Sequence, residues 1–348
     1  MSPTLSRGIT HANVLMTLLI VCMHAIWIDE TRLLPLFVLT NAAVPTFFVI
    51  SSLLYFQHWQ PTWACYRQKL LSRVRSLLVP YLLYNVLFYG YYVVKIHVLH
   101  MPTTKVIPTD TLGEALLCIL QSVPDGVLWY VRDLFLFALI APLIGLVLRK
   151  SRILSAVLTA ASLGCFLLPY ENLFFWTPCL LAGCYVALHA DTVVACFGRL
   201  HHSLTARRAG MLLTIAGVPA VCCAMASIPW DSLPFYLYRM SAPLFVAVAF
   251  CAFGSLLPER WVGHLSPLTF FIYCTHPAFV DAAKALVLYG PLADVTMPLA
   301  VRYGLVVLCT LLPMVLCAVA VRRLTPWLWR PLTGYRAETR HNTNTITQ

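Results

Sequence analysis

Charged side chains are scarce in this sequence. They make up 11% of its 348 residues, whereas an average soluble domain has about 25%. Hydrophobic residues make up 60%, and the mean hydropathy is +0.79. This composition excludes a soluble globular domain and is typical of an all-α, polytopic helical bundle in a membrane.

The sequence also lacks the short motifs of several function classes. It has no phosphate-binding loop, no dinucleotide-binding fingerprint, no internal repeat and no CxxC spacing. Nearly all of its 13 cysteines lie inside apolar runs, where cysteine packs as a small apolar side chain. We therefore expect neither a metal site nor a redox centre.

About ten apolar runs are long enough to cross roughly 30 Å of hydrocarbon. Basic residues gather in alternate connections, with only Arg32 and Lys105 in the others, and this asymmetry predicts that both termini are cytoplasmic. The same distribution accounts for the net charge of +11 without a nucleic-acid partner. The predicted spans are 10–29, 35–57, 77–99, 129–148, 152–170, 173–190, 209–228, 235–256, 267–289 and 299–321.

The chain is predicted to form one membrane domain, residues 1–334, followed by a polar, disordered cytoplasmic tail, residues 335–348. The longest external connection, about 100–128, contains the apolar segment 113–121, which suits a helix lying in the membrane interface. The first span is too long for a removable signal peptide and lacks a small-residue cleavage site.

The first apolar run carries a histidine that a simple membrane anchor would not need. On a helix turning 100° per residue, Asn13, Thr17 and His24 lie within about 40° of one another and form a polar stripe. An imidazole titrates near neutral pH, and polar groups at membrane depth usually have a partner or a task. His24 is therefore a candidate catalytic residue; the alternative is a structural histidine hydrogen-bonded between helices.

Seven other charged residues fall within or at the edges of the predicted spans. A charge at the bilayer centre costs about 2.5–3.5 kcal/mol on insertion scales, so these residues should face the bundle interior or the interface. Asp281 and Lys284 are three residues apart and can pair on a helix. The others are Lys95, Arg132, Asp133, Arg239 and Arg302.

Two segments at the ends of spans have both a structural and a functional interpretation. Trp129 and Tyr130, followed by Arg132 and Asp133, suit either an aromatic belt with a snorkelling arginine or a binding site at the external face. The segment 67–81 enters the third span from the predicted cytoplasmic side. It either anchors topology or binds an anionic cytosolic ligand through its arginines.

Within that basic segment, the helical spacing separates the cations into two groups. Lys69 and Arg73 are four residues apart and share a helix face, whereas Arg75 points elsewhere. A clamp for an anionic ligand would use the arginines, because guanidinium groups bind phosphate in a two-pronged fashion.

Five short motifs follow one another along the chain. They are His24 near the end of the first span, Pro45-Thr-Phe-Phe-Val-Ile-Ser-Ser-Leu-Leu-Tyr55, Arg73-Val-Arg-Ser-Leu-Leu-Val-Pro-Tyr81, Leu128-Trp-Tyr-Val-Arg-Asp133 and Ser266-Pro-Leu-Thr-Phe-Phe-Ile-Tyr-Cys-Thr-His276. In this order they resemble the integral-membrane acyltransferase family 3, which includes bacterial O-acetyltransferases of surface sugars, and the resemblance covers most of the chain. The sequence departs from the family at Asn13, where the family commonly has arginine, and at Ser51-Ser52, where it has Ser-Gly.

The resemblance implies an O-acyltransferase in the bacterial inner membrane. It implies acyl-CoA, most commonly acetyl-CoA, as co-substrate from the cytosol, with no bound cofactor, and a hydroxyl of a cell-surface or lipid-linked carbohydrate as acceptor. His24 would act as the general base, a role that typically accelerates a reaction about 10²–10⁴-fold. Alternatively, His24 would carry the acyl group covalently.

The resemblance also suggests roles for the other motif residues. Candidates for stabilising the developing negative charge are Arg132, Ser51 and Tyr273. Candidates for donor binding are Asn13, Arg73 and Arg75, and candidates for the acceptor site are Trp129, Tyr130, Asp133 and His276. The alternative function is a transporter of a small solute or sugar, with the pairs Asp281/Lys284 and Arg132/Asp133 as coupling sites.

Overall fold

A computed structural model of the chain describes residues 3–27, 30–98, 100, 107–121, 124–170, 172–189 and 203–335. Every element within these ranges is helical. Of the predicted features, most of the polar tail, the end of the sixth predicted span with the connection that follows it (residues 190–202) and Lys105 lie outside the described residues. The predicted interfacial segment is helical, although its position relative to a membrane stays a prediction.

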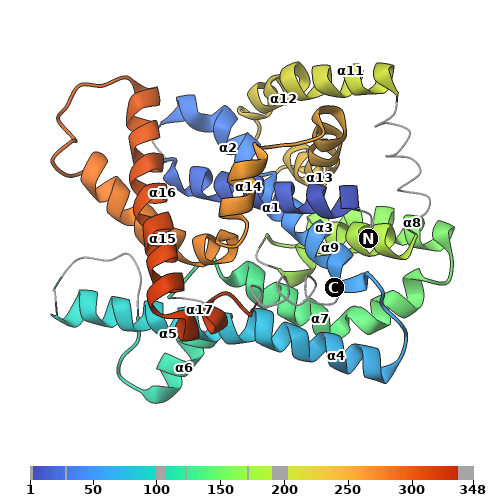
Figure 1. Cartoon of the computed structure of the whole chain (residues 1–348), viewed down its shortest axis with the longest axis horizontal. Coiled ribbons are helices and arrows are strands. Elements are labelled where there is room, and N and C mark those ends of the chain that lie inside the picture. Colours follow the sequence, from blue (N-terminus) through green and yellow to red (C-terminus); the bar gives the residue numbers. More distant parts are fainter. Residues whose placement is uncertain are drawn as a thin grey trace, which may run out of the picture.

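The helices follow the predicted spans closely. In chain order they are α1 (Pro3–Ala25), η1 (Thr31–Leu33), α2 (Leu34–Thr40), α3 (Ala43–Phe56), α4 (Trp63–Arg73), η2 (Val74–Leu78), α5 (Val79–Val93), η3 (Val94–Val98), α6 (Leu112–Leu120), α7 (Trp129–Leu148), α8 (Arg152–Ala161), η4 (Ser162–Leu167), η5 (Leu173–Trp176), α9 (Thr177–Leu188), α11 (Leu204–Leu212), η6 (Leu213–Gly217), α12 (Val218–Met225), α13 (Leu233–Phe253), α14 (Glu259–Leu265), α15 (Thr269–Val287), α16 (Leu299–Leu324) and α17 (Pro326–Leu332). Figure 1 shows them packed around α1 and α3.

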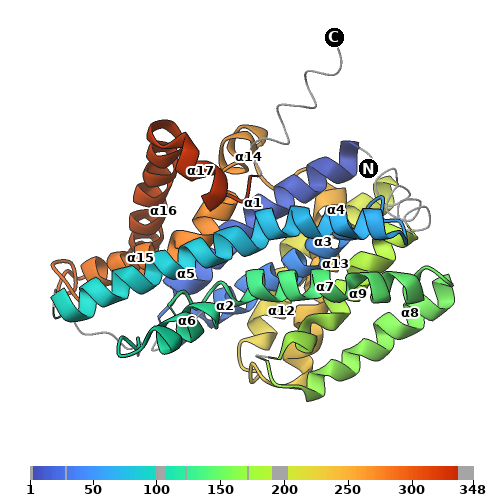
Figure 2. The same cartoon turned by 90° about the horizontal axis from the view of Figure 1, so that it is seen from below.

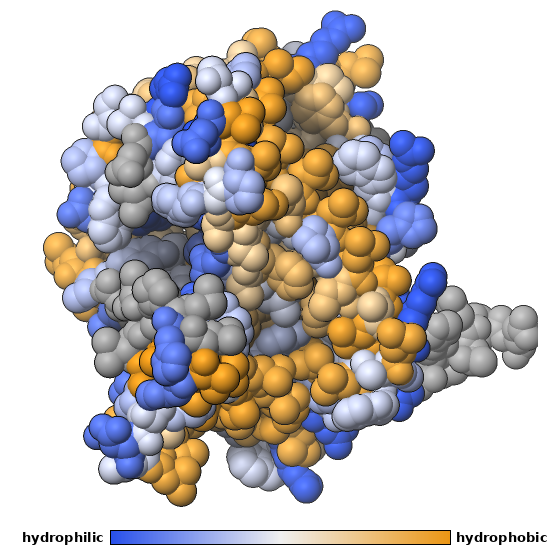
Figure 3. Space-filling view, turned by 90° about the vertical axis from the view of Figure 1, so that its left-hand side faces the viewer, coloured by the Kyte–Doolittle hydropathy of each residue, from blue (hydrophilic) through white to orange (hydrophobic). Residues whose placement is uncertain are grey.

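Within the described residues, seven helical runs are long and apolar enough to cross a membrane. The chain is therefore a multi-pass membrane protein, and the predicted all-α bundle is confirmed. The other three predicted spans are also helical, as the shorter runs Arg152–Leu167 and Leu173–Leu188 and as α15. Figure 3 shows hydrophobic side chains across the middle of one face and hydrophilic side chains at its edges, as expected for a surface in contact with lipid.

Two predicted boundaries differ from the structure. The first span was expected at 10–29, but α1 begins at Pro3 and ends at Ala25, which places His24 in its last turn. The third span was expected at 77–99, but the helical run begins at Trp63 and ends at Val98. In both cases the helix continues beyond the apolar run, because good helix formers such as Gln68, Lys69 and Leu70 propagate it.

The C-terminal end of α1 is held by two side chains from the last helices of the bundle. The ammonium of Lys284 on α15 donates to the carbonyl of Ile26 at 2.7 Å, and the hydroxyl of Tyr303 on α16 donates to the carbonyl of Cys22 at 2.9 Å. The last carbonyls of a helix lack partners within it, and a cation there also interacts favourably with the helix dipole. Lys284 lies near Asp281 as well, but its hydrogen bond goes to α1.

The run from α4 to α5 forms one long rod with a wider π-helical turn in it, as Figure 2 shows. This turn, η2, comes just before Pro80, which has no N–H to donate to the carbonyl of Ser76. Gly334 packs directly on Ser76 with a φ of +64°, and a Cβ at Gly334 would come within 2.6 Å of the Ser76 carbonyl oxygen. Only glycine fits this approach.

Helices α3 and α9 cross at very short range. A Cβ built on Gly183 would lie 2.3 Å from the carbonyl oxygen of Val49 and 2.8 Å from the Cβ of Ser52. The hydroxyl of Ser52 donates to the carbonyl of Leu180 at 2.5 Å, which ties the two helices together. Small residues at such crossings are typical of membrane helix packing. The contact fixes α3, which presents Ser51 to the interior.

Candidate active site

Two histidines from opposite ends of the chain meet in the bundle. His24 in the last turn of α1 and His276 in the middle of α15 have ring centroids 4.8 Å apart, with ring planes inclined at 54°. His276 is fully buried and His24 is half-buried. Their direct contact was not predicted from the sequence.

The hydrogen bonding of His276 determines where its free nitrogen lies. Its Nδ1 lies 2.7 Å from the carbonyl oxygen of Tyr273, and a carbonyl only accepts, so Nδ1 carries the hydrogen. Nε2 therefore presents a lone pair, and it is buried with no hydrogen-bond partner among the described residues. Buried polar atoms usually have a partner, so this nitrogen is a place where a ligand or water would bind.

One face of α3 lines the space next to these histidines. Phe47, Ser51 and Tyr55 are spaced four residues apart and therefore share that face. The hydroxyl of Ser51 lies 2.9 Å from that of Tyr130 on α7. The Tyr130 ring packs edge-on against that of Tyr273 at 5.8 Å, and Phe47 contacts both tyrosine rings.

The hydroxyl of Tyr273 is already engaged. It donates to the carbonyl of Val127 in the loop before α7, so its single hydrogen is not available to stabilise an oxyanion. The same loop contains Asp125, which is 1% exposed and accepts from the Val127 N–H at 3.4 Å. The loop carrying Asp125 thus forms part of the site wall, which the sequence did not reveal.

At the other end of α3, two cations gather over one ring. The ammonium of Lys69 lies 5.6 Å from the ring centroid of Tyr55, and the guanidinium of Arg73 lies 5.7 Å from it. Lys69 also donates to the carbonyl of Gln57 at 3.0 Å. The predicted shared face of Lys69 and Arg73 is confirmed. Arg75 is exposed and does not join them.

These contacts form one continuous series, which we call the central column. It runs from the cationic end of α4 to the histidine pair, and each member touches the next or lies one helical turn from it. Arg73 is also close enough to interact electrostatically with Tyr130. The members of the central column are Arg73, Tyr55, Ser51, Tyr130, Tyr273, His276 and His24.

A family model described as an acyltransferase domain, Acyl_transf_3, matches residues 8–321. The chain belongs to this acyltransferase family. No curated protein and no solved structure gives a significant match to it. The expected membership of acyltransferase family 3 is thereby confirmed, and the chain is a membrane acyltransferase.

Two positions where this acyltransferase departs from the family pattern have clear surroundings. Ser52, where the family has glycine, lies at the close crossing of α3 and α9. Its hydroxyl donates to the carbonyl of Leu180 on α9. Asn13, where the family commonly has arginine, is half-buried on α1, eleven residues or about 16 Å from His24 along the helix. Asn13 therefore cannot contact a group that reacts at His24.

Arg132 is directed away from the central column of the acyltransferase, whereas Asp133 lies one helical turn after Tyr130 on the buried side of α7. The Arg132 Nε donates to the Asp133 carboxylate at 3.0 Å, and Asp133 is 2% exposed. Arg132 follows Tyr130 by two residues and so points about 200° away from it on α7. Among the described residues no contact joins Arg132 to His24 or Ser51, so Ser51 is the oxyanion candidate that the geometry favours.

Trp129 borders the central column directly, because its ring packs edge-on against that of Tyr130 at 6.4 Å. The Trp129 ring also stacks on Trp176 at 6.0 Å, and Trp176 in turn stacks on Phe48 at 5.4 Å. Phe48 packs against Tyr130 at 4.8 Å. Trp129 therefore borders the central column and also belongs to a second aromatic group around Tyr170.

Sequence reasoning missed a buried histidine at the start of the acyltransferase domain. The Nδ1 of His11 accepts from the backbone N–H groups of Leu256 and Leu257, at 3.3 and 3.4 Å. Its Nε2 therefore carries the hydrogen and donates to Glu259 at 3.1 Å. Arg7 also donates to Glu259, at 2.6 Å from Nε. These hydrogen bonds of Arg7 and His11, which we call the latch, connect α1 to α14 and the residues before it. In the sequence, the only signal of this site was a histidine near the boundary of a predicted span.

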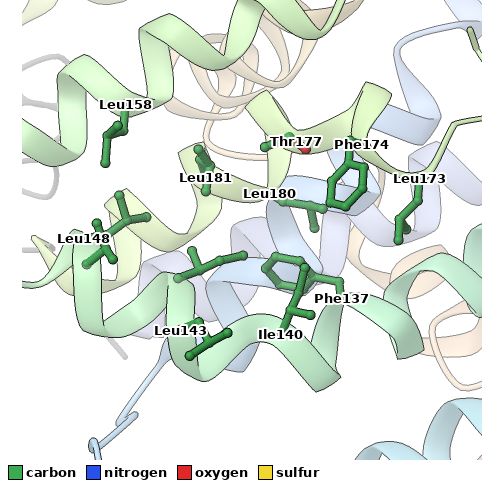
Figure 4. A pocket seen from close by; sticks show the side chains of 12 residues that line it. Phe137, Ile140, Leu143, Leu148, Leu158, Leu173, Phe174, Thr177, Leu180 and Leu181 are labelled. Atoms are coloured by element: carbon green, nitrogen blue, oxygen red, sulfur yellow. The ribbon is translucent and has the colours of Figure 1, made fainter. Parts of the chain in front are cut away.

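A cavity of about 410 Å³ between α7, α8 and α9 is not the active site. Figure 4 shows its walls, which are apolar except for Thr177. Leu143 on its rim is 68% exposed, so the cavity opens on the outside of the bundle. It holds no group that transfers a proton or stabilises charge.

Proposed function

We propose that this membrane acyltransferase moves an acyl group, most commonly acetyl, from acyl-CoA to a hydroxyl of a carbohydrate, with His24 as the general base. The observation that carries the proposal is the central column. It joins a pair of cations at one end to a pair of imidazoles at the other through the body of a membrane bundle. The family assignment favours acyl transfer over the alternative of solute transport.

The proposed reaction needs a base next to the acceptor hydroxyl. His24 takes the hydroxyl proton while the acceptor oxygen forms the ester bond to the acyl carbon. The carbon–sulfur bond then breaks, and the proton passes to the leaving CoA thiolate. A pathway in which His24 first accepts the acyl group uses the same atoms in two steps.

Stabilisation of the transition state is assigned to the Ser51 and Tyr130 hydroxyls. They lie 2.9 Å apart, and a hydroxyl pair in a site without bulk water stabilises a developing oxyanion more strongly than it would in solution. His276, whose ring centroid lies 4.8 Å from that of His24, is assigned to accept through Nε2 from a second hydroxyl of the acceptor, because the single hydrogen of the reacting hydroxyl goes to His24.

The donor is proposed to enter at the end of the bundle that carries Arg73 and Lys69, which is the predicted cytoplasmic side. Two cations over one tyrosine ring attract the phosphates of CoA, and guanidinium groups bind phosphate in a two-pronged fashion. The acceptor then reaches His24 from the opposite side, as a surface or lipid-linked sugar of a bacterial inner membrane would.

The test of the proposal uses purified protein in detergent and acetyl-CoA labelled in the acetyl group. We expect binding and slow release of labelled acetate in the absence of acceptor. Arg73→Ala should weaken acetyl-CoA binding about ten- to hundredfold, because a charge-assisted phosphate contact is lost. The matched control Arg75→Ala, which removes an exposed arginine two residues away, should change binding little.

Two results would contradict the donor assignment. The first is the same affinity for acetyl-CoA in Arg73→Ala as in the natural protein. The second is an equal loss of acetyl-CoA affinity in Arg73→Ala and Arg75→Ala. That result would mean that the arginines attract the anion by their charge alone and form no specific phosphate site. Movement of an unchanged solute without acyl transfer would favour the transporter.

A further inference from the structure

Arg239 on α13 is a buried cation that the proposed reaction does not use. It is 4% exposed and lies two turns into a helix that is long and apolar enough to cross a membrane. Its Nε donates to the side-chain oxygen of Asn41 at 3.1 Å, which fixes the orientation of the guanidinium. The sequence showed only that this arginine is within a span.

Three aromatic rings surround the guanidinium, and we call this group the Arg239 cage. The guanidinium carbon lies 4.6 Å from the centroid of Phe235, 5.3 Å from that of Tyr170 and 5.9 Å from that of Trp230. Phe235 is fully buried and forms the floor, whereas Trp230 is 53% exposed. The cage therefore opens toward the exposed indole of Trp230.

The Arg239 cage contains a positive charge and lacks a negative one. In the part of the chain that the structure describes, Arg239 has no ion pair, and its only hydrogen bond is the one to Asn41. Ring faces offset part of the desolvation of a cation but supply no hydrogen-bond acceptor in the guanidinium plane. An anion whose oxygens accept hydrogen bonds would supply both the negative charge and the acceptors that the guanidinium lacks among the described residues.

The Arg239 cage packs against aromatic rings that border the central column. Tyr170, one of its walls, packs against Trp129 at 6.0 Å, and Trp129 packs against Tyr130 at 6.4 Å. Asn41, which accepts from Arg239, precedes the first residue of α3, whereas Arg73 packs on Tyr55 near the last residue of α3. The cage therefore lies at the end of α3 opposite to Arg73, where the acceptor is proposed to enter.

We infer that the Arg239 cage is a subsite for an anionic group, a carboxylate or phosphate, carried by the sugar acceptor. This inference rests on the proposed function for the identity of the ligand. The Nη nitrogens hold two oxygens of the anion, and the apolar face of the adjoining sugar ring stacks on Trp230. The acyltransferase thereby prefers acidic or phosphorylated carbohydrates to neutral ones.

The test compares two sugars that differ at one carbon, which carries a carboxylate in one and a neutral hydroxymethyl group in the other. Purified protein in neutral detergent is titrated with methyl glucuronide and with methyl glucoside, and with glucose 1-phosphate as the phosphate probe, and tryptophan fluorescence is recorded. We expect the two anionic sugars to bind at least about tenfold more tightly than the glucoside. In Arg239→Gln this preference should disappear. The control Arg32→Gln, which removes an exposed arginine paired with Glu30, should retain it.

Further variants separate charge from folding. Trp230→Leu keeps the cation and should weaken all three sugars by a similar factor while leaving the preference for anions intact. Should Arg239→Gln fail to fold, the comparison of probes on the natural protein and on Trp230→Leu still decides the inference. Equal affinity of the natural protein for the glucuronide and the glucoside would overturn it, as would an anion preference that survives in folded Arg239→Gln.

Two additional readouts identify the source of failure. Competition by phosphatidylglycerol in mixed micelles, dependent on Arg239 and without binding of any sugar, would assign the cage to a lipid headgroup and overturn the acceptor assignment. Labelled acetyl-CoA is measured on the same samples. Retained acetyl-CoA binding in Arg239→Gln, with loss of the sugar preference, is the expected result. Loss of acetyl-CoA binding in the natural protein would instead be a failure of the proposed function.

Discussion

The tight crossing of α3 and α9 gives the most quantitative prediction. In Gly183→Ala, the new Cβ would lie 2.3 Å from the carbonyl oxygen of Val49 and 2.8 Å from the Cβ of Ser52, where ordinary contacts are 3.4–4 Å. Neither neighbour is the end of a flexible side chain. The two helices must therefore separate by about 1 Å or tilt.

The cost follows from two terms. Overpacking a close-packed contact costs about 1–3 kcal/mol, and separation of the helices also weakens the hydrogen bond from Ser52 to Leu180, worth about 1 kcal/mol. The total of about 2–4 kcal/mol should lower the thermal unfolding midpoint by about 3–6 °C, because a chain of 348 residues has a large unfolding entropy. Because Ser51 is adjacent on α3, acyl transfer should fall as well.

The assay is thermal unfolding in detergent together with release of labelled acetate from acetyl-CoA. The matched control is Gly304→Ala in α16, where a Cβ would meet nothing within 4 Å. We expect that control to be neutral or slightly stabilising, because alanine favours a helix over glycine. A midpoint and activity in Gly183→Ala equal to those of Gly304→Ala would refute the argument that this crossing holds the site together.

Two further predictions concern the ends of α1. Hydrogen bonding from Arg7 holds the pKa of Glu259 below its ordinary value. The latch therefore stabilises the folded state above the unfolded pKa of about 4.3 and is lost as pH falls through the lower, folded pKa. Glu259→Gln should lower the unfolding midpoint at pH 7 and lower it progressively less as the pH falls below the unfolded pKa, and a difference that does not change with pH would contradict the charge assignment. Lys284→Met should cost about 1.5–3 kcal/mol, since the carbonyl of Ile26 loses a charged donor, with partial recovery in Lys284→Gln. An unchanged unfolding midpoint in Lys284→Met would show that this hydrogen bond does not stabilise the folded protein.

Local periodicity predicted the features that depend on one helix. The polar stripe of α1 and the shared face of Lys69 and Arg73 follow from 100° per residue, and the structure has both. Span positions followed from hydropathy, because a membrane helix must be apolar over a fixed length. The helix ends were less predictable, since helix formers outside the hydrocarbon extend α1 and α4.

The contacts between distant segments were not predictable from one sequence. The meeting of His24 with His276 depends on how α1 and α15 pack, and no local pattern records that geometry. The Arg239 cage takes its rings from separate segments. Arg132 belongs to one of the family motifs, but the motif did not show that its guanidinium donates to the neighbouring Asp133.

The central claim is that His24 is the base for acyl transfer, and single-turnover transfer from labelled acetyl-CoA tests it most directly. The measurement compares the natural protein with His24→Ala and with the matched control His97→Ala, a histidine in η3 outside the central column. The account predicts that His24→Ala binds acetyl-CoA normally, inserts and accumulates, and transfers acetyl at least about 100-fold more slowly, while His97→Ala keeps the natural rate. Full transfer by His24→Ala would contradict the account.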